Sequence, residues 1–402
     1  MNTDFHRKNE VKLLYVLNVA QRVNNFSHSA MLAAKELGFE FHIAGNWSYP
    51  SDLEREADEK EYGIRIHQID FIRTPYHPGN WKAYVQLKKL VQREKYDVIH
   101  CNTPIGGVLG RVVGRQCKVP KIIYQAHGFH FFKGAPKINW ILFYPIEHWL
   151  ARYTDVLITI NHEDYNFAKN KFKLHHDGKI HYVPGVGIDT LQYGNKKNVR
   201  MVKRDELGLS NSDIAIISMG DLIERKDYET AIYAISNAKN DKLHYYICGN
   251  GPEEEKLKMI AKKLGIINNI HFLGYRLDIK ELLLASDIFL FTTRQEGLPR
   301  SMMEAMASGL PCIASRIRGN VDLLEGMEGG FLCDKGEILS FAEKINLLAE
   351  NSFMRKEMGK NNLNSIRKFS TEAVTNELKK IYIEEVAENS SMGCVDNKRA
   401  LK

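Results

Sequence analysis

The stretch TTRQEGLPRSMMEAMASGLPCIAS, residues 292–315, places two carboxylates, Glu296 and Glu304, on either side of a turn. The apolar run IFLFTT that leads into it predicts a buried strand. EGLP then forms a glycine–proline turn, and RSMMEAMASG predicts a helix that ends at Gly309, just before the next proline-led strand. Strand, turn, helix and strand in this order are the repeating unit of a parallel α/β sheet.

Similar apolar runs recur along the chain, separated by segments with helical periodicity. Continuous apolar runs are typical of strands covered on both faces, and helical connections between them make the strands parallel. The predicted strands are VKLLYVLN, FEFHIAGN, IRIHQID, YDVIHCN, KIIYQAH and VLITIN in the first half, and IAIISMGD, LHYYICG, NIHFLGY, IFLFTT and PCIAS in the second. We therefore predict an α/β protein with two doubly wound, Rossmann-like domains that face each other across a ligand-binding cleft.

The length and the spacing of turn residues locate the domain boundary. At 402 residues the chain exceeds what one hydrophobic core usually supports. Glycine, proline and asparagine gather in HYVPGVGIDTLQYGNKKN, so we expect one domain over residues 1–190 and a second that begins at residue 191. The last residues, 388–402, lack periodicity, and we expect a flexible tail there.

Composition excludes several classes of protein. The 6 cysteines are scattered without a CxxC or Cys/His cluster, which argues against a zinc site or a disulfide framework and fits a reduced, cytoplasmic setting. The N-terminus carries charges and no long apolar region, so the sequence predicts neither a signal peptide nor a spanning helix.

Positive charge gathers in the first half of the chain. Lys+Arg outnumber Asp+Glu by 28 to 19 in residues 1–200, whereas the ratio is 28 to 30 in residues 201–402. This imbalance indicates either a solvated basic surface or an anionic partner, such as a phospholipid surface or a pyrophosphate-bearing lipid. A nucleic-acid partner is not expected, because no binding motif accompanies the charge.

The two glutamates of the opening stretch could both face a ligand above the helix N-terminus. Carboxylates beside a phosphate are costly unless they contact neutral hydroxyl groups, so their expected partners are sugar and ribose hydroxyls. The alternative is that Glu296 caps the helix and Glu304 is a surface residue. Unpaired backbone N–H groups at the helix start would receive phosphate oxygens, and the positions expected around the phosphate are Gly297, Leu298, Pro299, Ser301 and Met302.

A basic pair lies at the tip of another predicted strand. In SMGDLIERKDYETAI the strand ends at Gly220, and Arg225 and Lys226 precede a helix that begins near Asp227. Unit charges 4 Å apart attract by about 4 kcal/mol at an effective dielectric of 20, against about 0.3–1 kcal/mol for a helix N-terminus. These two cations should therefore dominate the binding of a diphosphate, although basic pairs are often only solvated.

Two further loops in the second half of the chain offer weaker signals. Gly249 and Gly251 in CGNGPEEEKL allow a tight strand-to-helix turn that either contacts a ligand or is only a turn. The loop with Tyr275 and Arg276 could hold a nucleobase through backbone atoms.

In YQAHGFHFFKGAPKINW, a strand is followed by His127, His130 and Lys133. His127 either hydrogen-bonds a substrate hydroxyl or is a structural histidine. The aromatic and lysine residues that follow could rest at a membrane interface or pack in the core.

Taken together, these motifs resemble glycosyltransferase family 4, whose members have the GT-B fold, and the resemblance spans nearly the whole chain. Its most specific mark is the E-x7-E signature of Glu296 and Glu304, supported by GDLIERKDY and AHG. AHGFHFFKGAP, FYPIEHWLARYTDVLITINHEDY and YVPGVGID resemble bacterial capsule and exopolysaccharide enzymes. Such enzymes transfer a sugar from a nucleotide donor, with retention of configuration, often to a polyprenyl-diphosphate-linked acceptor at the cytoplasmic face of the membrane.

The resemblance implies a role for each matching residue. Glu296 would contact the donor sugar hydroxyls, Glu304 the ribose, Arg225 and Lys226 the diphosphate, and His127 the donor sugar beside the acceptor. Residues 1–190 would bind the acceptor, residues 191–369 the nucleotide sugar, and a helix over 370–387 would pack back on the first domain.

Two departures from the family pattern stand out. Asp221 follows the glycine of the basic motif where many relatives have an Arg or a small residue, and NVAQRVNNFSH (18–28) replaces the usual glycine-rich loop. The role of each segment is therefore open.

The sequence also carries expectations about mechanism and partners. No Asp-x-Asp motif occurs, so we expect metal-independent transfer without a cofactor. As a separate expectation, the donor is a UDP-linked hexose or N-acetylhexosamine. A lipid-linked or oligosaccharide acceptor, the inner face of the cell membrane and other glycan-assembly enzymes are the expected partners. Alternatives are a nucleotide-sugar epimerase and a non-catalytic nucleotide-sugar-binding partner in a polysaccharide assembly complex; a nicotinamide dehydrogenase is disfavoured because no GxGxxG follows the first strand.

Overall fold

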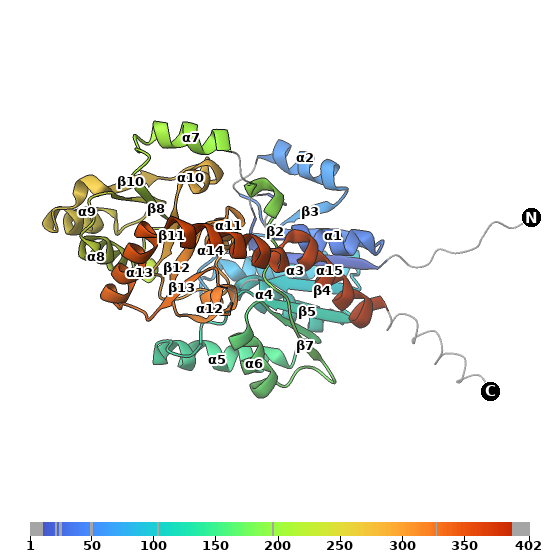
Figure 1. Cartoon of the computed structure of the whole chain (residues 1–402). Coiled ribbons are helices and arrows are strands. Elements are labelled where there is room, and N and C mark those ends of the chain that lie inside the picture. Colours follow the sequence, from blue (N-terminus) through green and yellow to red (C-terminus); the bar gives the residue numbers. More distant parts are fainter. Residues whose placement is uncertain are drawn as a thin grey trace, which may run out of the picture. The chain divides into compact units, whose positions relative to one another are not determined.

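The computed structural model describes residues 11–20, 22–23, 26–48, 51–102, 104–194, 197–326 and 328–387. The predicted tail 388–402 and parts of the loop 18–28 lie outside these residues. The chain forms two compact units, one built from residues up to Gly187 together with those from Thr371 on, and one from Ile188–Ser370 (Figure 1). The chain passes from one unit to the other close to the expected boundaries at 190/191 and 369/370.

The first unit contains a seven-stranded parallel sheet in the order β3-β2-β1-β4-β5-β6-β7. Its strands are β1 (Lys12–Val19), β2 (Glu40–Asn46), β3 (Arg65–Gln68), β4 (Val98–Asn102), β5 (Lys121–Ala126), β6 (Val156–Thr159) and β7 (Lys179–Tyr182). The connecting helices are α1 (His28–Glu36), α2 (Asp52–Tyr62), α3 (Gly79–Glu94), α4 (Pro104–Gln116), α5 (Lys137–Ala151) and α6 (His162–Lys171).

Both faces of this sheet are buried, as the continuous apolar strands require. Alternate residues of β1 serve two cores: Leu13 and Tyr15 join the core under α1, whereas Leu14 joins the core under α3, α4, α5 and α6. The final helix α15 (Thr371–Tyr382) packs on α1 and completes the first of these cores. The hydroxyl of Tyr382, the last residue of α15, forms a hydrogen bond of 2.7 Å with Nδ1 of the buried His100.

The second unit repeats the arrangement with six parallel strands in the order β10-β9-β8-β11-β12-β13. The strands are β8 (Ile214–Met219), β9 (Leu243–Cys248), β10 (Ile270–Gly274), β11 (Ile288–Phe291), β12 (Cys312–Ser315) and β13 (Gly330–Cys333). Its helices are α7 (Lys197–Glu206), α8 (Tyr228–Ala238), α9 (Glu254–Lys263), α10 (Ile279–Ala285), α11 (Arg300–Ala307), α12 (Arg318–Leu324), α13 (Ile338–Glu350) and α14 (Ser352–Ser365).

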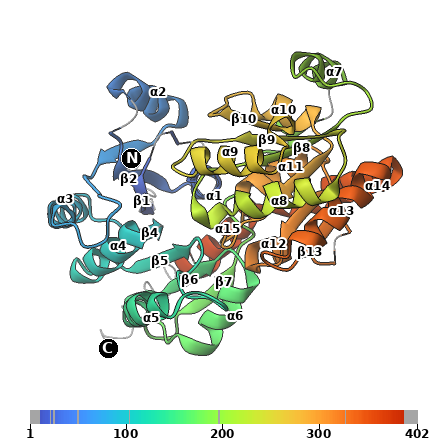
Figure 2. The ribbon, with the colours of Figure 1, turned by 90° about the vertical axis from the view of Figure 1, so that its left-hand side faces the viewer.

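Helices cover both faces of the second sheet too. Those on one face include α8, α9 and α13, and those on the other include α10, α11 and α12 (Figure 2). Each unit therefore has the predicted doubly wound form. The strand prediction was incomplete at the edges, because it omitted β7 and β13. Each is four residues long and mostly half-exposed, so neither shows the apolar run of a central strand.

Glycines let the strand ends of the second unit approach each other through their backbones. Gly220 and Gly249 follow β8 and β9 with φ of 142° and 144°. The Gly249 N–H donates to the Gly274 carbonyl at 2.8 Å, and a Cβ on Gly249 would lie 2.0 Å from the Gly220 oxygen. Gly251 packs equally closely, because its Cβ would lie 2.3 Å from the Leu222 oxygen. These glycines are required for packing, whether or not they also contact a ligand.

We predict that Gly249→Ala lowers the free energy of unfolding by about 2–4 kcal/mol, because it adds both backbone strain and a steric clash. Urea titration followed by circular dichroism measures this loss. Gly194→Ala is the matched control, since Gly194 has φ −59° and its Cβ would lie 3.9 Å from the Leu191 oxygen, an ordinary van der Waals distance. Equal midpoints for the two variants would contradict the prediction.

Candidate functional site

The order of the second sheet reverses between β8 and β11, and ligands of such sheets bind outside the carboxyl ends of the strands at this switch point. The loop after β8 carries Arg225 and Lys226 in a short 3-10 helix, Glu224–Lys226. The loop after β11 carries Glu296. The topology therefore brings together two motifs that lie about 70 residues apart in the sequence.

Glu296 joins these two loops. Its Oε1 accepts hydrogen bonds from Lys226 Nζ at 2.8 Å, Arg225 Nη1 at 2.9 Å and Thr293 Oγ1 at 3.1 Å. The Arg225 side chain is 41% exposed, whereas those of Lys226 and Glu296 are 13% and 14% exposed. Both cations of the basic pair therefore hold the Glu296 carboxylate, a contact that the sequence analysis did not predict. Two cations and one anion leave the cluster with a net charge of +1.

Backbone and side-chain hydrogen bonds fix the loops around this cluster. Thr292 Oγ1 donates to the Asp227 carbonyl at 2.8 Å, and the Arg294 N–H donates to the Arg225 carbonyl at 2.9 Å. The Arg294 guanidinium also pairs with the buried Asp227 carboxylate at 3.0 Å. The sequence analysis did not single out Arg294, although it lies two residues before Glu296 in the opening stretch.

A second arginine that the sequence analysis missed holds the Glu296 backbone. Arg318 is the first residue of α12 and is 7% exposed, and its Nε donates to the Glu296 carbonyl at 2.9 Å. The chain after it packs closely, since a Cβ on Gly319 would lie 2.3 Å from the Gly297 oxygen. The segment RIRGN, which follows a predicted strand, is the sequence signal for this contact. It does not indicate that the partner of Arg318 is the Glu296 carbonyl.

Glu304 lies inside α11, one turn after Arg300. Its Oε1 accepts a hydrogen bond from Arg300 Nε at 3.0 Å, and its side chain is 17% exposed. Burial, with the Glu304 carboxylate nearby, raises the pKa of Tyr193. Glu304 is thus a partly buried residue with partners, and no side-chain hydrogen bond caps α11, so Glu296 does not cap this helix.

The other candidates of the second unit differ in what they can offer a ligand. The Met302 side chain is fully buried in the core, and Leu298 packs against the same core, so only their backbones could meet a phosphate. Tyr275 is 76% exposed. Arg276 is held by both oxygens of Asp278, at 2.7 and 2.6 Å, which raises the pKa of its guanidinium.

In the first unit His127 follows β5 and is half-buried. Its Nε2 lies 3.0 Å from Oδ1 of Asn102, the last residue of β4, and the Phe26 ring contacts its edge. Burial lowers the pKa of His127 to about 4, so the imidazole is neutral at neutral pH. Of its neighbours, His130 packs against Phe143 with the two rings tilted by 31°, and the backbone N–H of Lys133 donates to Glu163.

Metal and membrane features were sought in the described part of the chain. One group there, His181, Glu384 and Glu385, has spacing suited to a metal ion, but Glu385 is already paired with Lys179 at 2.8 Å. This group belongs to the first unit, whereas Glu296 and Glu304 belong to the second. Among the described residues, no helix combines the length and apolar character needed to cross a bilayer.

Two family models match separate parts of this chain. Residues 12–161 match the family model described as glycosyl transferase 4-like, and residues 199–365 match that of glycosyl transferases group 1. A putative glycosyltransferase EpsD of Bacillus subtilis is 33% identical over 92% of this chain and 96% of the relative.

Two further matches carry substrate names. UDP-Gal:alpha-D-GlcNAc-diphosphoundecaprenol alpha-1,3-galactosyltransferase of Escherichia coli is 30% identical over 76% of this chain and 80% of the relative. The structure of Anabaena Alr3699/HepE in complex with UDP and glucose covers 93% of this chain and 100% of that chain with a TM-score of 0.77 and 18% identity. At that identity the structural match shows the fold, which is GT-B.

Two neutral histidines with lowered pKa values make the stability of the protein depend on pH. Burial lowers the pKa of His100 to about 3 and that of His127 to about 4. The unfolded chain binds these protons near pH 6.5, so the free energy of unfolding should fall as pH drops from 6.5 toward 4, by about 1.4 kcal/mol per pH unit for each histidine. Urea titrations at pH 7.0, 5.5 and 4.5 measure this slope. We expect His100→Asn to reduce it, and an unchanged slope would show that His100 does not contribute.

Proposed function

The chain belongs to glycosyltransferase family 4, and we propose that it moves a hexose or N-acetylhexosamine from a UDP-sugar, with retention of configuration, to a polyprenyl-diphosphate-linked glycan in capsule or exopolysaccharide biosynthesis. The observation that carries this proposal is the cluster of Arg225, Lys226 and Glu296 at the switch point of the second sheet. The E. coli relative is named for UDP-Gal and a GlcNAc-diphosphoundecaprenol acceptor, and HepE was crystallised with UDP and glucose. Both names support a UDP-linked donor.

The basic pair can bind a diphosphate without releasing Glu296. A lysine ammonium has three donor hydrogens and an arginine guanidinium has five. Each cation can therefore donate hydrogen bonds to the carboxylate and to phosphate oxygens at the same time. Glu296 neutralises part of the charge and holds Lys226, which is 13% exposed, in place. The remaining +1 charge then attracts the diphosphate, and the Glu296 carboxylate is available to the hydroxyls of the transferred sugar.

We propose that catalysis acts chiefly on the leaving group. As the bond between the sugar and the diphosphate breaks, negative charge grows on the UDP oxygens and positive charge on the sugar ring. Fixed cations beside the diphosphate stabilise this state more than the ground state. A diphosphate oxygen then accepts the proton of the acceptor hydroxyl on the face from which UDP departs, so the configuration is retained without a metal ion.

Further residues are assigned to the ends of the substrates. Glu304 accepts hydrogen bonds from the ribose hydroxyls, with Arg300 holding its carboxylate in place. The neutral imidazole of His127 contacts a substrate hydroxyl. The backbones around Gly297 and Ser301 lie at the start of α11, where N–H groups favour phosphate.

We also propose that the protein works at the inner face of the cell membrane, beside other glycan-assembly enzymes. The excess of basic residues in the first half of the chain supports attraction to anionic lipids. Helix α5 adds an exposed apolar face, formed by Ile138, Ile141, Leu142 and Trp149. A membrane-bound acceptor would be reached more easily from such a position.

We predict that Lys226→Ala lowers kcat/KM for transfer about 100-fold, because charge-assisted hydrogen bonds contribute up to about 3 kcal/mol. Glu304→Ala should raise the donor KM about tenfold. Release of UDP from a panel of UDP-sugars, with GlcNAc-diphosphoundecaprenol and without acceptor, measures both. Lys263→Ala, at an exposed position of α9, is the matched control. Full activity in both variants would reject the site, and conversion of the sugar without acceptor would indicate an epimerase.

Transfer should be independent of divalent metals. We expect the initial rate to be unchanged, within about twofold, after dialysis against EDTA and after addition of Mg²⁺ or Mn²⁺, because Arg225 and Lys226 supply the charge that a metal would otherwise supply. Loss of activity with EDTA and its recovery with one of these ions would overturn this assignment of the leaving-group charge.

A further inference from the structure

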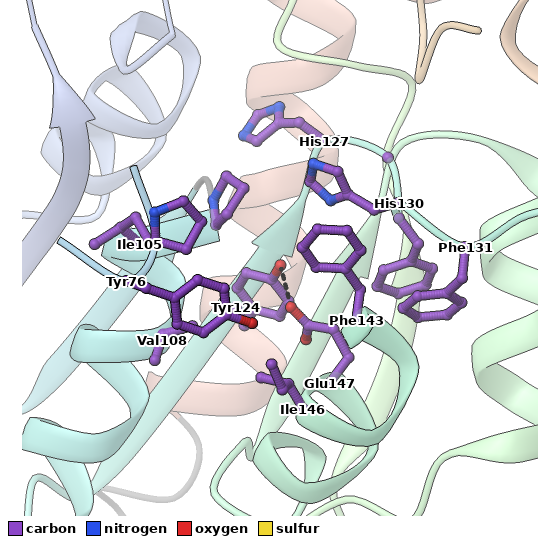
Figure 3. A pocket seen from close by; sticks show the side chains of 14 residues that line it. Tyr76, Ile105, Val108, Tyr124, His127, His130, Phe131, Phe143, Ile146 and Glu147 are labelled. Atoms are coloured by element: carbon purple, nitrogen blue, oxygen red, sulfur yellow. Dashed lines mark hydrogen bonds between the residues drawn. The ribbon is translucent and has the colours of Figure 1, made fainter. Parts of the chain in front are cut away.

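The first unit contains a pocket of about 380 Å³ beside His127, a volume within the usual range for small-molecule sites (Figure 3). It is lined by the segment after β3, the start of α4, the end of β5 with the loop that follows, and one side of α5. Its walls are mainly apolar, and Figure 3 shows the side chains of Ile105, Val108, Phe143 and Ile146 around the space. Nothing in the E-x7-E or basic motifs points to this pocket.

One carboxylate stands in this apolar wall. Glu147 is 14% exposed, and its Oε2 accepts a hydrogen bond at 2.8 Å from Nη1 of Arg111, whose side chain is 1% exposed. The Tyr124 hydroxyl donates to Glu147 Oε1 at 3.3 Å, as Figure 3 shows, and the Arg111 guanidinium lies 3.8 Å from the Tyr124 ring centroid. Arg111 Nε also donates to the Gly107 carbonyl at 2.8 Å.

Stability alone does not account for this buried pair. Removing two charges from water costs several kcal/mol for each ion, and apolar residues of similar size often stabilise a protein as well or better. Since Arg111 is enclosed and Glu147 retains some exposure at the pocket wall, the arrangement holds a carboxylate in a fixed orientation toward the pocket. Among the described residues, Oε1 accepts one long hydrogen bond, at 3.3 Å from the Tyr124 hydroxyl, so it can accept another.

The charge of the wall excludes three kinds of occupant. A diphosphate would meet a carboxylate, and among the residues that the structure describes no Lys or Arg side chain lines the pocket. An organic cation would find the Glu147 charge already balanced by Arg111. A hydrocarbon chain would cover the open side of the carboxylate without offering a hydrogen bond, which is costly. These three exclusions leave a neutral molecule that has apolar surfaces and also hydroxyl groups. A pyranose sugar is such a molecule.

We propose that this pocket binds the neutral sugar at the reacting end of the acceptor, and that Glu147 accepts a hydrogen bond from one of its hydroxyl groups. The proposal rests on the transferase function proposed above and adds a specificity-determining residue. The aromatic and aliphatic wall covers the C–H faces of the sugar, whereas Glu147 selects a ring with a hydroxyl at the matching position. Arg111 and Tyr124 hold that carboxylate from behind.

Three variants of the full-length protein test the proposal. Glu147→Gln removes the charged acceptor. Val108→Phe fills the pocket and leaves the ion pair intact, so it remains informative if the buried Arg111 charge prevents Glu147→Gln from folding. Glu56→Gln, at an exposed position of α2, is the matched control. Circular dichroism and the urea midpoint establish that each variant is folded.

The probes are GlcNAc-diphosphoundecaprenol and a short-chain alkyl diphosphate of the same sugar. For Glu147→Gln and Val108→Phe we expect KM to rise at least tenfold for both probes, with kcat, the donor KM and UDP-sugar hydrolysis without acceptor within about twofold of the wild type. An increase in KM for the undecaprenyl probe alone would show that the pocket holds lipid. Unchanged KM values for both probes would show that it holds no part of the acceptor. Either result overturns the proposal, as does an equal loss of donor hydrolysis.

A binding measurement separates this inference from the proposed function. Saturation-transfer NMR with methyl N-acetylglucosaminide should show binding to the wild type and to Glu56→Gln, and at least fivefold weaker transfer with Val108→Phe. This readout does not require turnover. If the wild type fails to transfer sugar yet shows this pattern, the proposed function fails and the sugar pocket stands. If transfer occurs without this pattern, the pocket assignment fails alone.

Discussion

A single carboxylate shared by two cations holds together the switch point of the second sheet. Glu296 accepts from Arg225 and Lys226, which belong to the loop after β8, although Glu296 itself follows β11. Parallel order makes this possible, because β8 and β11 are neighbours whose carboxyl ends meet at the same edge. Without the carboxylate, two cations would repel each other beside a helix start that is itself electropositive. The shared carboxylate thus offsets this repulsion and leaves the cluster with a net charge of +1.

Most strands could be predicted from the sequence because buried parallel strands consist of continuous apolar runs. IAIISM and IFLF are examples, and both are central strands of the second sheet. The edge strands KIHY and GFLC were missed because edge positions need no such run. Gly249 was recognised as a turn residue, but its close approach to the Gly220 oxygen depends on the spacing of β8 and β9, which periodicity does not encode.

Sequence motifs could mark candidate residues of the site, but they could not show which side chains form hydrogen bonds with each other. The E-x7-E spacing and the basic pair identify side chains, yet sequence patterns cannot show that Glu296 is hydrogen-bonded to the basic pair. Arg318 and Arg294 were missed for a related reason. Each acts through a backbone carbonyl or a buried aspartate that lies far away in the sequence, so nothing near either residue marks its partner.

The two units use similar charged groups with different net charge, and that difference bears on what each can bind. In the second unit two cations share one carboxylate, which leaves a positive surplus suited to a diphosphate. In the first unit one guanidinium balances one carboxylate, and the pocket beside them is otherwise apolar. A balanced pair can orient hydroxyl groups but offers an anion no net attraction. Because the donor carries its charge on the diphosphate whereas an acceptor sugar is neutral, each charge balance fits the ligand proposed for its unit.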